Sequence, residues 1–144
     1  MEAATVVIPT RDEIAAAHCR IRTHVRRSPI LRVEAGALGV PSPLLLKLEH
    51  LQITGSFKVR GAFENLLSRD VPAAGVVAFS GGNHGAAVAH AASALGHRAT
   101  VYVPAAIARP EKLARMRAFG AEVIEAEGAV ADVLTQFTAH AERT

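Results

Sequence analysis

The chain has 144 residues, of which half are hydrophobic and a fifth are charged, and its formal net charge is +3 with histidine neutral. This length and composition predict an ordered globular chain that buries roughly 70% of the surface exposed when it is unfolded. The basic residues are scattered and aromatic residues are few, so nucleic-acid binding is not expected. Charged residues from Arg11 to Glu13 interrupt any secretory leader, and no stretch reaches the ~18 apolar residues of a membrane span.

The single cysteine, Cys19, has no partner in the chain for a disulfide. It lies in a helical pattern and is expected to pack as a small apolar residue. A reducing, cytoplasmic setting fits this cysteine usage. Seven histidines are scattered along the chain without a Cys/His/carboxylate cluster at metal-binding spacing, so no metal site is predicted.

The first part of the chain is expected to contain a helix followed by short extended segments. Thr10 and Glu13 have the spacing of a capping box, and apolar residues follow at helical spacing, which predicts an amphipathic helix over Thr10–Val25. The dipeptide Ser28-Pro29 ends this helix. After it we expect an extended or turn-like segment at 30–33, a short helix at 34–38 closed by Gly39, and a strand at 44–50 with a buried apolar part at 44–48.

Beyond a polar segment at 69–75, which is the predicted internal boundary, strands and helices alternate regularly. Strands are expected at 76–79, 99–103 and 121–125, and helices at 83–95, from Pro110 to Gly120, and at 130–143 with Val130, Val133, Leu134 and Phe137 facing inward. This alternation implies an α/β fold in which parallel strands are joined by right-handed crossovers. In an open sheet of this kind, ligands bind beyond the carboxyl ends of the strands.

The most informative stretch is Lys47–Ala62, in which a predicted strand passes through a Thr-Gly-Ser turn into a helix that runs to about Ser68. Lys58 falls in the first turn of that helix, and Ser56 has the position of an N-cap. Unpaired N–H groups and the helix dipole favour the neutral amine of a lysine held there. Such an amine is what an aldehyde cofactor needs to form an imine, and Phe57 offers an aromatic surface beside it.

This stretch closely resembles the lysine segment of fold-type II pyridoxal-phosphate (PLP) enzymes, specifically the serine/threonine dehydratase and serine racemase group, whose signature is K-x-E-x-x-Q-x-T-G-S-F-K-x-R-G-A. The matching positions are Lys47, Glu49, Gln52, Thr54, Gly55, Ser56, Phe57, Lys58, Arg60, Gly61 and Ala62. The resemblance implies that Lys58 is the Schiff-base lysine and the catalytic residue. Glu49 and Arg60 are expected to brace the lysine loop rather than to catalyse.

A second candidate stretch, Ser80–Gly85, follows a predicted strand and opens a helix. Its glycines allow backbone N–H groups to approach a ligand, and a helix N-terminus favours an anion, so a small carboxylate would fit. The stretch matches neither the dinucleotide fingerprint nor the P-loop. It is similar to the Ser-x-Gly-Asn-His turn of the dehydratases, in which the turn binds the substrate carboxylate and the asparagine contacts the 3-hydroxyl of the cofactor.

The resemblance therefore implies two sets of binding residues. The expected cofactor-binding residues are Phe57, Lys58 and Asn83, and the expected substrate-carboxylate residues are Ser80, Gly81, Gly82, Asn83 and His84. The racemases carry a serine at the position of Gly81, where it supplies a proton to the opposite face of the substrate carbon. Glycine has no side chain to donate that proton, so we predict elimination rather than racemisation.

The resemblance covers residues 10–144 but only the N-terminal portion of a family architecture that is more than twice as long. It implies a three-layer α/β fold with a parallel sheet and flanking helices, an incomplete version of the tryptophan synthase β-like PLP fold. Residues 1–68 would be a piece of the large PLP domain and residues 69–144 the small α/β domain. No run of three glycines occurs in the chain, so the glycine loop that cradles the PLP phosphate is expected to lie outside it. The unpaired faces of residues 44–48 and of the Lys58 helix would then be exposed.

The resemblance implies a truncated PLP-dependent ammonia-lyase that converts serine or threonine to a 2-oxo acid and ammonia. Its expected partners are this small amino-acid substrate and either a complementing C-terminal half or further copies of the chain. The alternatives are a β-replacement enzyme similar to threonine or cysteine synthase, a non-catalytic PLP-fold fragment, and a nucleotide-binding module. The last is disfavoured because no acidic ribose-binding residue follows the glycine turn at the expected distance.

Overall fold

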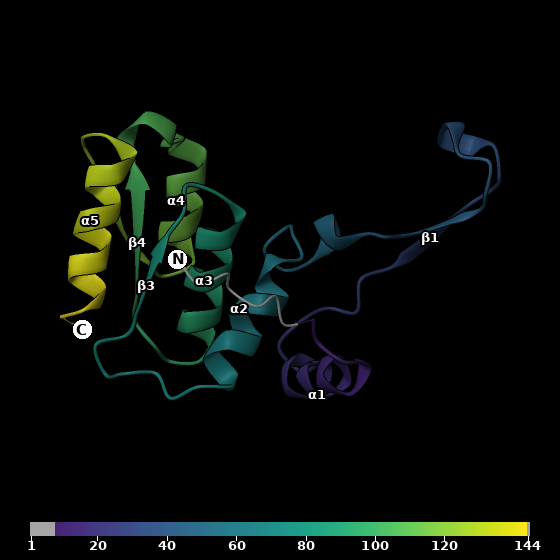
Figure 1. Ribbon diagram of the computed structural model, residues 1–144, viewed down its shortest axis with the longest axis horizontal. Coiled ribbons are helices and arrows are strands. Elements are labelled where there is room, and N and C mark those ends of the chain that lie inside the picture. The colour runs from purple at the N-terminus through teal and green to yellow at the C-terminus, as the bar shows by residue number, and fades with distance from the viewer. Residues whose placement is uncertain (1–7, 144) are drawn as a thin grey trace.

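The computed structural model describes residues 8–143, which form five helices and five strands in two connected parts (Figure 1). The elements in chain order are α1 (Arg11–Ile21), β1 (Ile30–Val33), β2 (Leu44–Lys47), α2 (Lys58–Leu67), β3 (Val76–Phe79), α3 (Asn83–Ala94), β4 (Ala99–Pro104), α4 (Pro110–Ala118), β5 (Glu122–Ala126) and α5 (Val130–Ala141). Short 3₁₀ turns occur at Ala37–Gly39, Glu49–Leu51 and Ala105–Ile107.

The C-terminal part is a three-layer α/β unit. Its parallel sheet has the strand order β3-β4-β5, with Val76 opposite Ala99 and Val101 opposite Val123. Helices α3 and α4 lie on one side of the strands and α5 lies on the other, where it packs against β3 and β4 (Figure 1). The structure thus confirms the predicted α/β fold with a parallel sheet and flanking helices. Because β3, β4 and β5 run in the same direction, their carboxyl ends share one edge of the sheet, where the glycine turn begins.

The N-terminal part consists of α1, the antiparallel hairpin β1–β2, and α2. Helix α1 packs on α2, and α2 packs on α3, while the hairpin extends away from the body of the molecule (Figure 1). Ile30, Leu31 and Leu45 of the hairpin are exposed. Isolated two-stranded hairpins are marginally stable, so this exposed apolar surface marks the hairpin as the least supported element of the fold.

The main core joins both parts. Helix α3 is rich in alanine, and Ala87, Ala89, Ala91 and Ala92 are fully buried, which lets α2 and the sheet approach it closely. Phe63 of α2 and Met116 of α4 belong to the same buried cluster. A smaller cluster around Tyr102, Ala126 and Val133 lies beneath α5. The core is continuous across the predicted boundary at residues 68 and 69, and the division into two domains stays a prediction.

Most predicted elements are present, with ends that differ by one or a few residues. The capping box of α1 is formed, since the backbone N–H of Thr10 donates to Glu13 Oε2 at 2.7 Å and the backbone N–H of Glu13 donates to Thr10 Oγ1 at 3.2 Å. The helix itself ends at Ile21 instead of Val25. The strand predicted at 44–50 ends at Lys47, because the chain turns at Glu49.

Four expectations about individual residues are wrong. Ser56 is not the N-cap of α2, because the helix begins at Lys58 and Phe57 precedes it without a side-chain cap. Cys19 is exposed and is not packed as an apolar residue. Leu45 is 71% exposed, because the hairpin has no third strand beside it among residues 8–143. In α5, Val133 is buried and Phe137 is partly buried, but Val130 and Leu134 are exposed because the narrow sheet covers only one stripe of the helix.

No helix within the described range is both long and apolar enough to cross a membrane. The same residues contain no group of three or more His, Cys, Asp or Glu side chains that could hold a metal ion.

Candidate functional site

Lys58 is the first residue of α2, where the sequence predicted a helix start. The turn before it is closed by a hydrogen bond from the backbone N–H of Gly55 to the carbonyl of Gln52 at 2.7 Å, and Gly55 has a φ of +66° that favours glycine. The Lys58 Nζ atom lies 5.1 Å from the centre of the Phe57 ring. The amine and the aromatic ring therefore lie side by side on the exposed side of the turn, as expected for a lysine that binds a flat ring.

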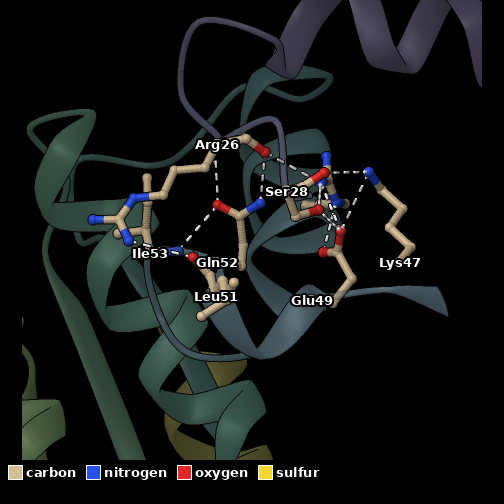
Figure 2. A network of polar contacts seen from close by, with 8 residues as sticks. Arg26, Ser28, Lys47, Glu49, Leu51, Gln52 and Ile53 are labelled. Atoms are coloured by element: carbon tan, nitrogen blue, oxygen red, sulfur yellow. Dashed lines mark hydrogen bonds and ion pairs between the residues drawn. The ribbon is translucent and has the colours of Figure 1, made fainter. Parts of the chain in front are cut away.

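A carboxylate network holds the strand-to-helix connection in place (Figure 2). The Arg60 guanidinium donates from Nε to Glu49 Oε2 at 2.9 Å and from Nη2 to Glu49 Oε1 at 2.8 Å. The hydroxyl of Ser28 also donates to Glu49, and Lys47 Nζ lies 3.8 Å from the same carboxylate. These contacts, the Arg60 hydrogen bonds first, lower the pKa of Glu49 from 4.5 to about 2.

Gln52 ties the same connection to the segment that follows α1 (Figure 2). Its Oε1 accepts hydrogen bonds from the backbone N–H groups of Arg26 and Ile53 at 2.8 and 3.0 Å, and its Nε2 donates to the Arg26 carbonyl at 2.8 Å. Glu49, Gln52 and Arg60 thus fix the lysine turn from outside the reacting centre. These contacts agree with the bracing role expected for Glu49 and Arg60. Sequence reasoning missed the roles of Ser28 and Arg26, which carry no pattern of their own.

Thr54 and Ser56, on either side of Gly55, are buried, and their hydroxyls have no hydrogen-bond partner among the described residues. The Arg115 guanidinium of α4 covers the turn, since a Cβ added to Gly55 would lie 3.0 Å from Arg115 Nη2. The turn is therefore closely packed on one side while Lys58 remains exposed on the other.

The glycine turn connects β3 to α3 at the carboxyl edge of the sheet. The backbone N–H of Ser80 donates to the carbonyl of Tyr102 at 3.0 Å, and the N–H of Gly82 donates to Ser80 Oγ at 3.2 Å. Helix α3 begins at Asn83 without a side-chain cap, so its first N–H groups remain available to an anion. Gly85 permits the close approach of α3 to the sheet, because a Cβ there would lie 2.8 Å from the carbonyl oxygen of Ser80.

The packing of α2 on α3 brings the two candidate stretches together. Phe57, Lys58, Gly61, Ala62 and His84 line one cavity of about 260 Å³. Partial burial, and after it the positive charge of Lys58, lowers the pKa of His84. A second cavity of about 300 Å³ shares Gly61, Ala62 and His84 and continues between α2, β3 and α3.

The other predicted site residues lie beside this cavity rather than in its lining. Ser80, Gly81 and Gly82 form the partly buried turn, and Asn83 is exposed at the start of α3. A larger cavity of about 550 Å³ lies between α1 and the Glu49 network, where Arg22, Arg26 and Arg27 line it together with Lys47 and Arg60. Lys58 does not line that cavity, so the chemistry assigned to Lys58 belongs to the smaller one.

The donor set around Lys58 fits a pyridoxal ring. A primary amine can form an imine with an aldehyde, an aromatic ring lies beside that amine, and helix N–H groups are available to a carboxylate on the neighbouring turn. The predicted contact of Asn83 with the cofactor and the carboxylate roles of Ser80–His84 stay predictions.

Comparisons with known proteins agree with this geometry. Residues 21–143 match the family model described as "Pyridoxal-phosphate dependent enzyme". The chain is 42% identical over 126 residues to a phenylserine dehydratase of Ralstonia pickettii, an alignment that covers 85% of this chain and 38% of that protein. It is also 38% identical over 113 residues to an L-threonine ammonia-lyase of Geobacter sulfurreducens, covering 77% of this chain and 28% of that enzyme.

Solved structures that resemble this chain also belong to a deaminase and a racemase. A threonine deaminase from T.th. superposes with a TM-score of 0.81 at 40% identity, and the match covers 94% of this chain and 43% of that one. Maize serine racemase superposes with the same TM-score of 0.81 at 31% identity, covering 93% and 42% of the two chains. This chain therefore spans well under half the length of the relatives that it matches. The family model, the relatives and the lysine turn agree, and the chain belongs to the family of pyridoxal-phosphate dependent enzymes.

Proposed function

We propose that this chain provides the lysine and the carboxylate-binding turn of an ammonia-lyase that acts on a small β-hydroxy amino acid such as serine or threonine. The observation that carries the proposal is the shared cavity in which Lys58, at the start of α2, meets His84, at the start of α3. Three of the four relatives named above are a dehydratase, an ammonia-lyase and a deaminase, which supports elimination as the reaction class, and the fourth is a serine racemase.

In this proposal each group of the chain has one task. The N–H groups at the start of α3, together with Ser80, hold the substrate carboxylate and orient its α-carbon toward Lys58. Pyridoxal phosphate, when bound to Lys58, supplies the electron sink for the reaction. Once the substrate amine has taken its place on the cofactor, the freed amine of Lys58 would accept the α-proton, and the β-hydroxyl would leave as water with a proton taken from solvent. Hydrolysis would then release a 2-oxo acid and ammonia.

A complementing C-terminal half is part of the proposal. Two surfaces support it: the exposed apolar hairpin β1–β2, and strand β3, which pairs only with β4 among the described residues. The chain passes from β3 through β4 to β5, and helix α5 then returns across β4 and β3, so a further parallel strand after α5 could pair with β3. Association of several copies of the chain would be a second way to cover the hairpin.

The first test asks whether the lysine site is formed in this chain. The purified chain is mixed with PLP, reduced with borohydride and mapped by peptide mass. Its three lysines provide internal controls, because Lys47 and Lys112 should stay unlabelled while Lys58 carries one pyridoxyl group. Labelling spread over all three lysines, or none, would favour a non-catalytic fragment.

The second test measures the reaction in a chimera in which residues 8–143 replace the matching segment of the T.th. threonine deaminase. We expect a 2-oxo acid from serine or threonine, and no 2-oxo acid from the Lys58→Ala chimera. Turnover only of an O-activated serine with an added thiol would instead show β-replacement and contradict the proposed elimination.

A further inference from the structure

The lysine turn receives little support from its own side chains. Helix α2 begins at Lys58 without the side-chain cap that commonly fixes a helix start. The hydroxyls of Thr54 and Ser56 have no hydrogen-bond partner among the described residues. A hydrogen bond from the backbone N–H of Gly55 to the carbonyl of Gln52, at 2.7 Å, closes only the start of the turn. The path from Gly55 to Lys58 therefore depends on contacts from other elements.

Arg115 of α4 supplies such a contact. A Cβ built on Gly55 would lie 3.0 Å from Arg115 Nη2, 3.6 Å from Nη1 and 3.8 Å from Cζ, so the guanidinium occupies the space beside Gly55. Gly55 has a φ of +66°, which disfavours a side chain at this position, and the bare backbone lets the guanidinium approach the turn. The turn is thus covered by a group from the C-terminal α/β unit rather than by a residue of its own segment.

A row of rings holds the guanidinium from behind. Arg115 Cζ lies 5.7 Å from the centre of the Phe119 ring. Phe119 meets His90 of α3 edge to face with ring centres 5.2 Å apart, and His90 meets Phe63 of α2 in the same way at 5.9 Å. Phe63 is fixed, since it is buried in the main core. Arg115 makes no ion pair among residues 8–143, so stacking on Phe119 rather than a counter-ion sets where the guanidinium lies.

Helix α4 belongs to the unit that also carries the glycine turn. It packs on α3, whose first turn places His84 in one cavity with Lys58. We propose that Arg115 is a positioning residue, which holds the lysine turn against α4 so that Lys58 stays in the cavity that it shares with His84. The inference rests on the proposed function and adds to it a residue that acts through Lys58 without touching the substrate.

The first test measures the rate at which PLP and borohydride label Lys58 in the 144-residue chain. Arg115→Ala should slow this labelling at least about fivefold, because a lysine that has lost its geometry reacts no faster than a surface amine. Its Tm should change by less than about 2 °C, because Arg115 is exposed. Arg117→Ala on the same helix is the matched control, since Arg117 pairs with Glu125, and should keep the rate within about twofold.

Two results of this test would overturn the proposal. One is an equal labelling rate in Arg115→Ala and in the unsubstituted chain. The other is an unsubstituted chain without label on Lys58, because the turn that Arg115 is proposed to hold would then not be formed.

A double-mutant cycle tests whether the rings hold the guanidinium in place. Phe119→Leu removes the ring behind Arg115 and should itself slow the labelling of Lys58. In the Phe119→Leu background, Arg115→Ala should slow it by less than about a further twofold, because the guanidinium is no longer held. An equal effect of Arg115→Ala in both backgrounds would overturn the stacked position on which the proposal rests.

The threonine deaminase chimera separates this role from the proposed reaction. Arg115→Ala should lower kcat for 2-oxo acid formation at least about tenfold and change KM by less than about threefold, because the amine is misplaced while the carboxylate-binding turn is intact. A raised KM with an unchanged kcat would overturn the positioning role, since Arg115 would then act on substrate binding. An unsubstituted chimera that forms no 2-oxo acid would overturn the proposed function, while the labelling rates would still decide the role of Arg115.

Discussion

The guanidinium of Arg60 donates two hydrogen bonds to the carboxylate of Glu49, at 2.9 and 2.8 Å. Glu49 lies just after β2, and Arg60 lies in the first turn of the helix that begins with Lys58. The pair therefore fixes the position of the lysine relative to the strand that leads to it. Both side chains are largely buried, so the pair is less screened by solvent than an ion pair at the surface.

The first prediction concerns this pair. Glu49→Gln removes the charge at nearly constant volume and leaves the Arg60 guanidinium without its counter-ion, so we expect the free energy of unfolding to fall by about 1–3 kcal/mol. Arg117→Gln is the matched control, because the Arg117–Glu125 pair is about half exposed and should contribute less than about 1 kcal/mol. Urea unfolding of both variants measures the difference, and equal losses would show that the Glu49 pair is an ordinary surface contact.

The second prediction is a dependence of stability on pH. The pKa of Glu49 is lowered to about 2 in the folded chain, whereas it is near its ordinary value of 4.5 when unfolded. A carboxylate with a depressed pKa contributes to the free energy of unfolding. For Glu49 this contribution is fully present above pH 4.5 and is lost as the pH falls toward 2. Unfolding measured between about pH 6 and pH 2 should show this loss, and Glu49→Gln should reduce the slope in that window. If Glu49→Gln keeps the wild-type slope of unfolding free energy against pH, the acid sensitivity comes from other carboxylates.

The third prediction tests whether Lys58 and His84 are neighbours in solution. Lys58→Met removes a positive charge while keeping much of the side-chain volume, so the pKa of His84 should rise. The rise should stop short of the ordinary value, because burial is the larger cause of the lowered pKa. Titration of the His84 ring protons by NMR measures the change, and Lys112→Met should leave the His84 curve in place. An unchanged His84 curve in Lys58→Met would contradict the shared cavity.

The fourth prediction concerns the approach of α3 to the sheet. A Cβ at Gly85 would lie 2.8 Å from the carbonyl oxygen of Ser80 and 2.9 Å from Met116 Cε. Since the backbone cannot yield without moving the glycine turn, Gly85→Ala should cost more than about 2 kcal/mol of unfolding free energy. Gly61→Ala in α2 is the control, because nothing lies within 4 Å of its added Cβ and alanine is the better helix former. In chemical unfolding, the midpoint denaturant concentration should therefore fall for Gly85→Ala and rise for Gly61→Ala.

The fifth prediction uses the buried hydroxyl of Thr54, which makes no hydrogen bond among the described residues. Thr54→Val keeps the shape and removes a desolvated polar atom, so we expect stability to stay equal or to rise. Thr54→Ala also removes a methyl group and should destabilise the chain by about 1 kcal/mol through the cavity that it leaves. A clear loss of stability in Thr54→Val would indicate that the hydroxyl has a polar partner in solution.

Local patterns predicted the elements of the β3–α5 unit well, because each carries its own periodicity and its own stop signal. Gly96, for example, follows α3 with a φ of +78°, as expected for a glycine that ends a helix. The same reasoning failed where burial depends on a neighbour. The spacing of Val130 and Leu134 is helical, but whether they are covered depends on the width of the sheet beneath α5.

In the candidate site, too, local sequence predicted some features, and contacts between distant segments decided the others. The lysine signature was sufficient to place Lys58 at a helix start, since a strand, a turn and a helix signal follow one another within a few residues. The assignment of Ser56 as the N-cap was wrong. Whether this serine caps the helix or is buried depends on how the turn packs against α4, and that packing is not visible in the local sequence. The partners of Gln52 could not be read from the chain, because they lie on the backbone of Arg26, in another segment.

The sequence by itself determined the strand–helix alternation, the position of Lys58 and the glycine turn, because these depend on interactions between residues close together in the chain. Only the tertiary structure decided that His84 shares a cavity with Lys58, that Glu49 is held by Ser28 and Arg60, and that Arg115 covers Gly55. Each of those contacts forms when α2 packs on α3, when the segment after α1 meets the lysine turn, or when α4 comes to lie beside that turn. Packing between distant segments sets such distances, and no local pattern records them.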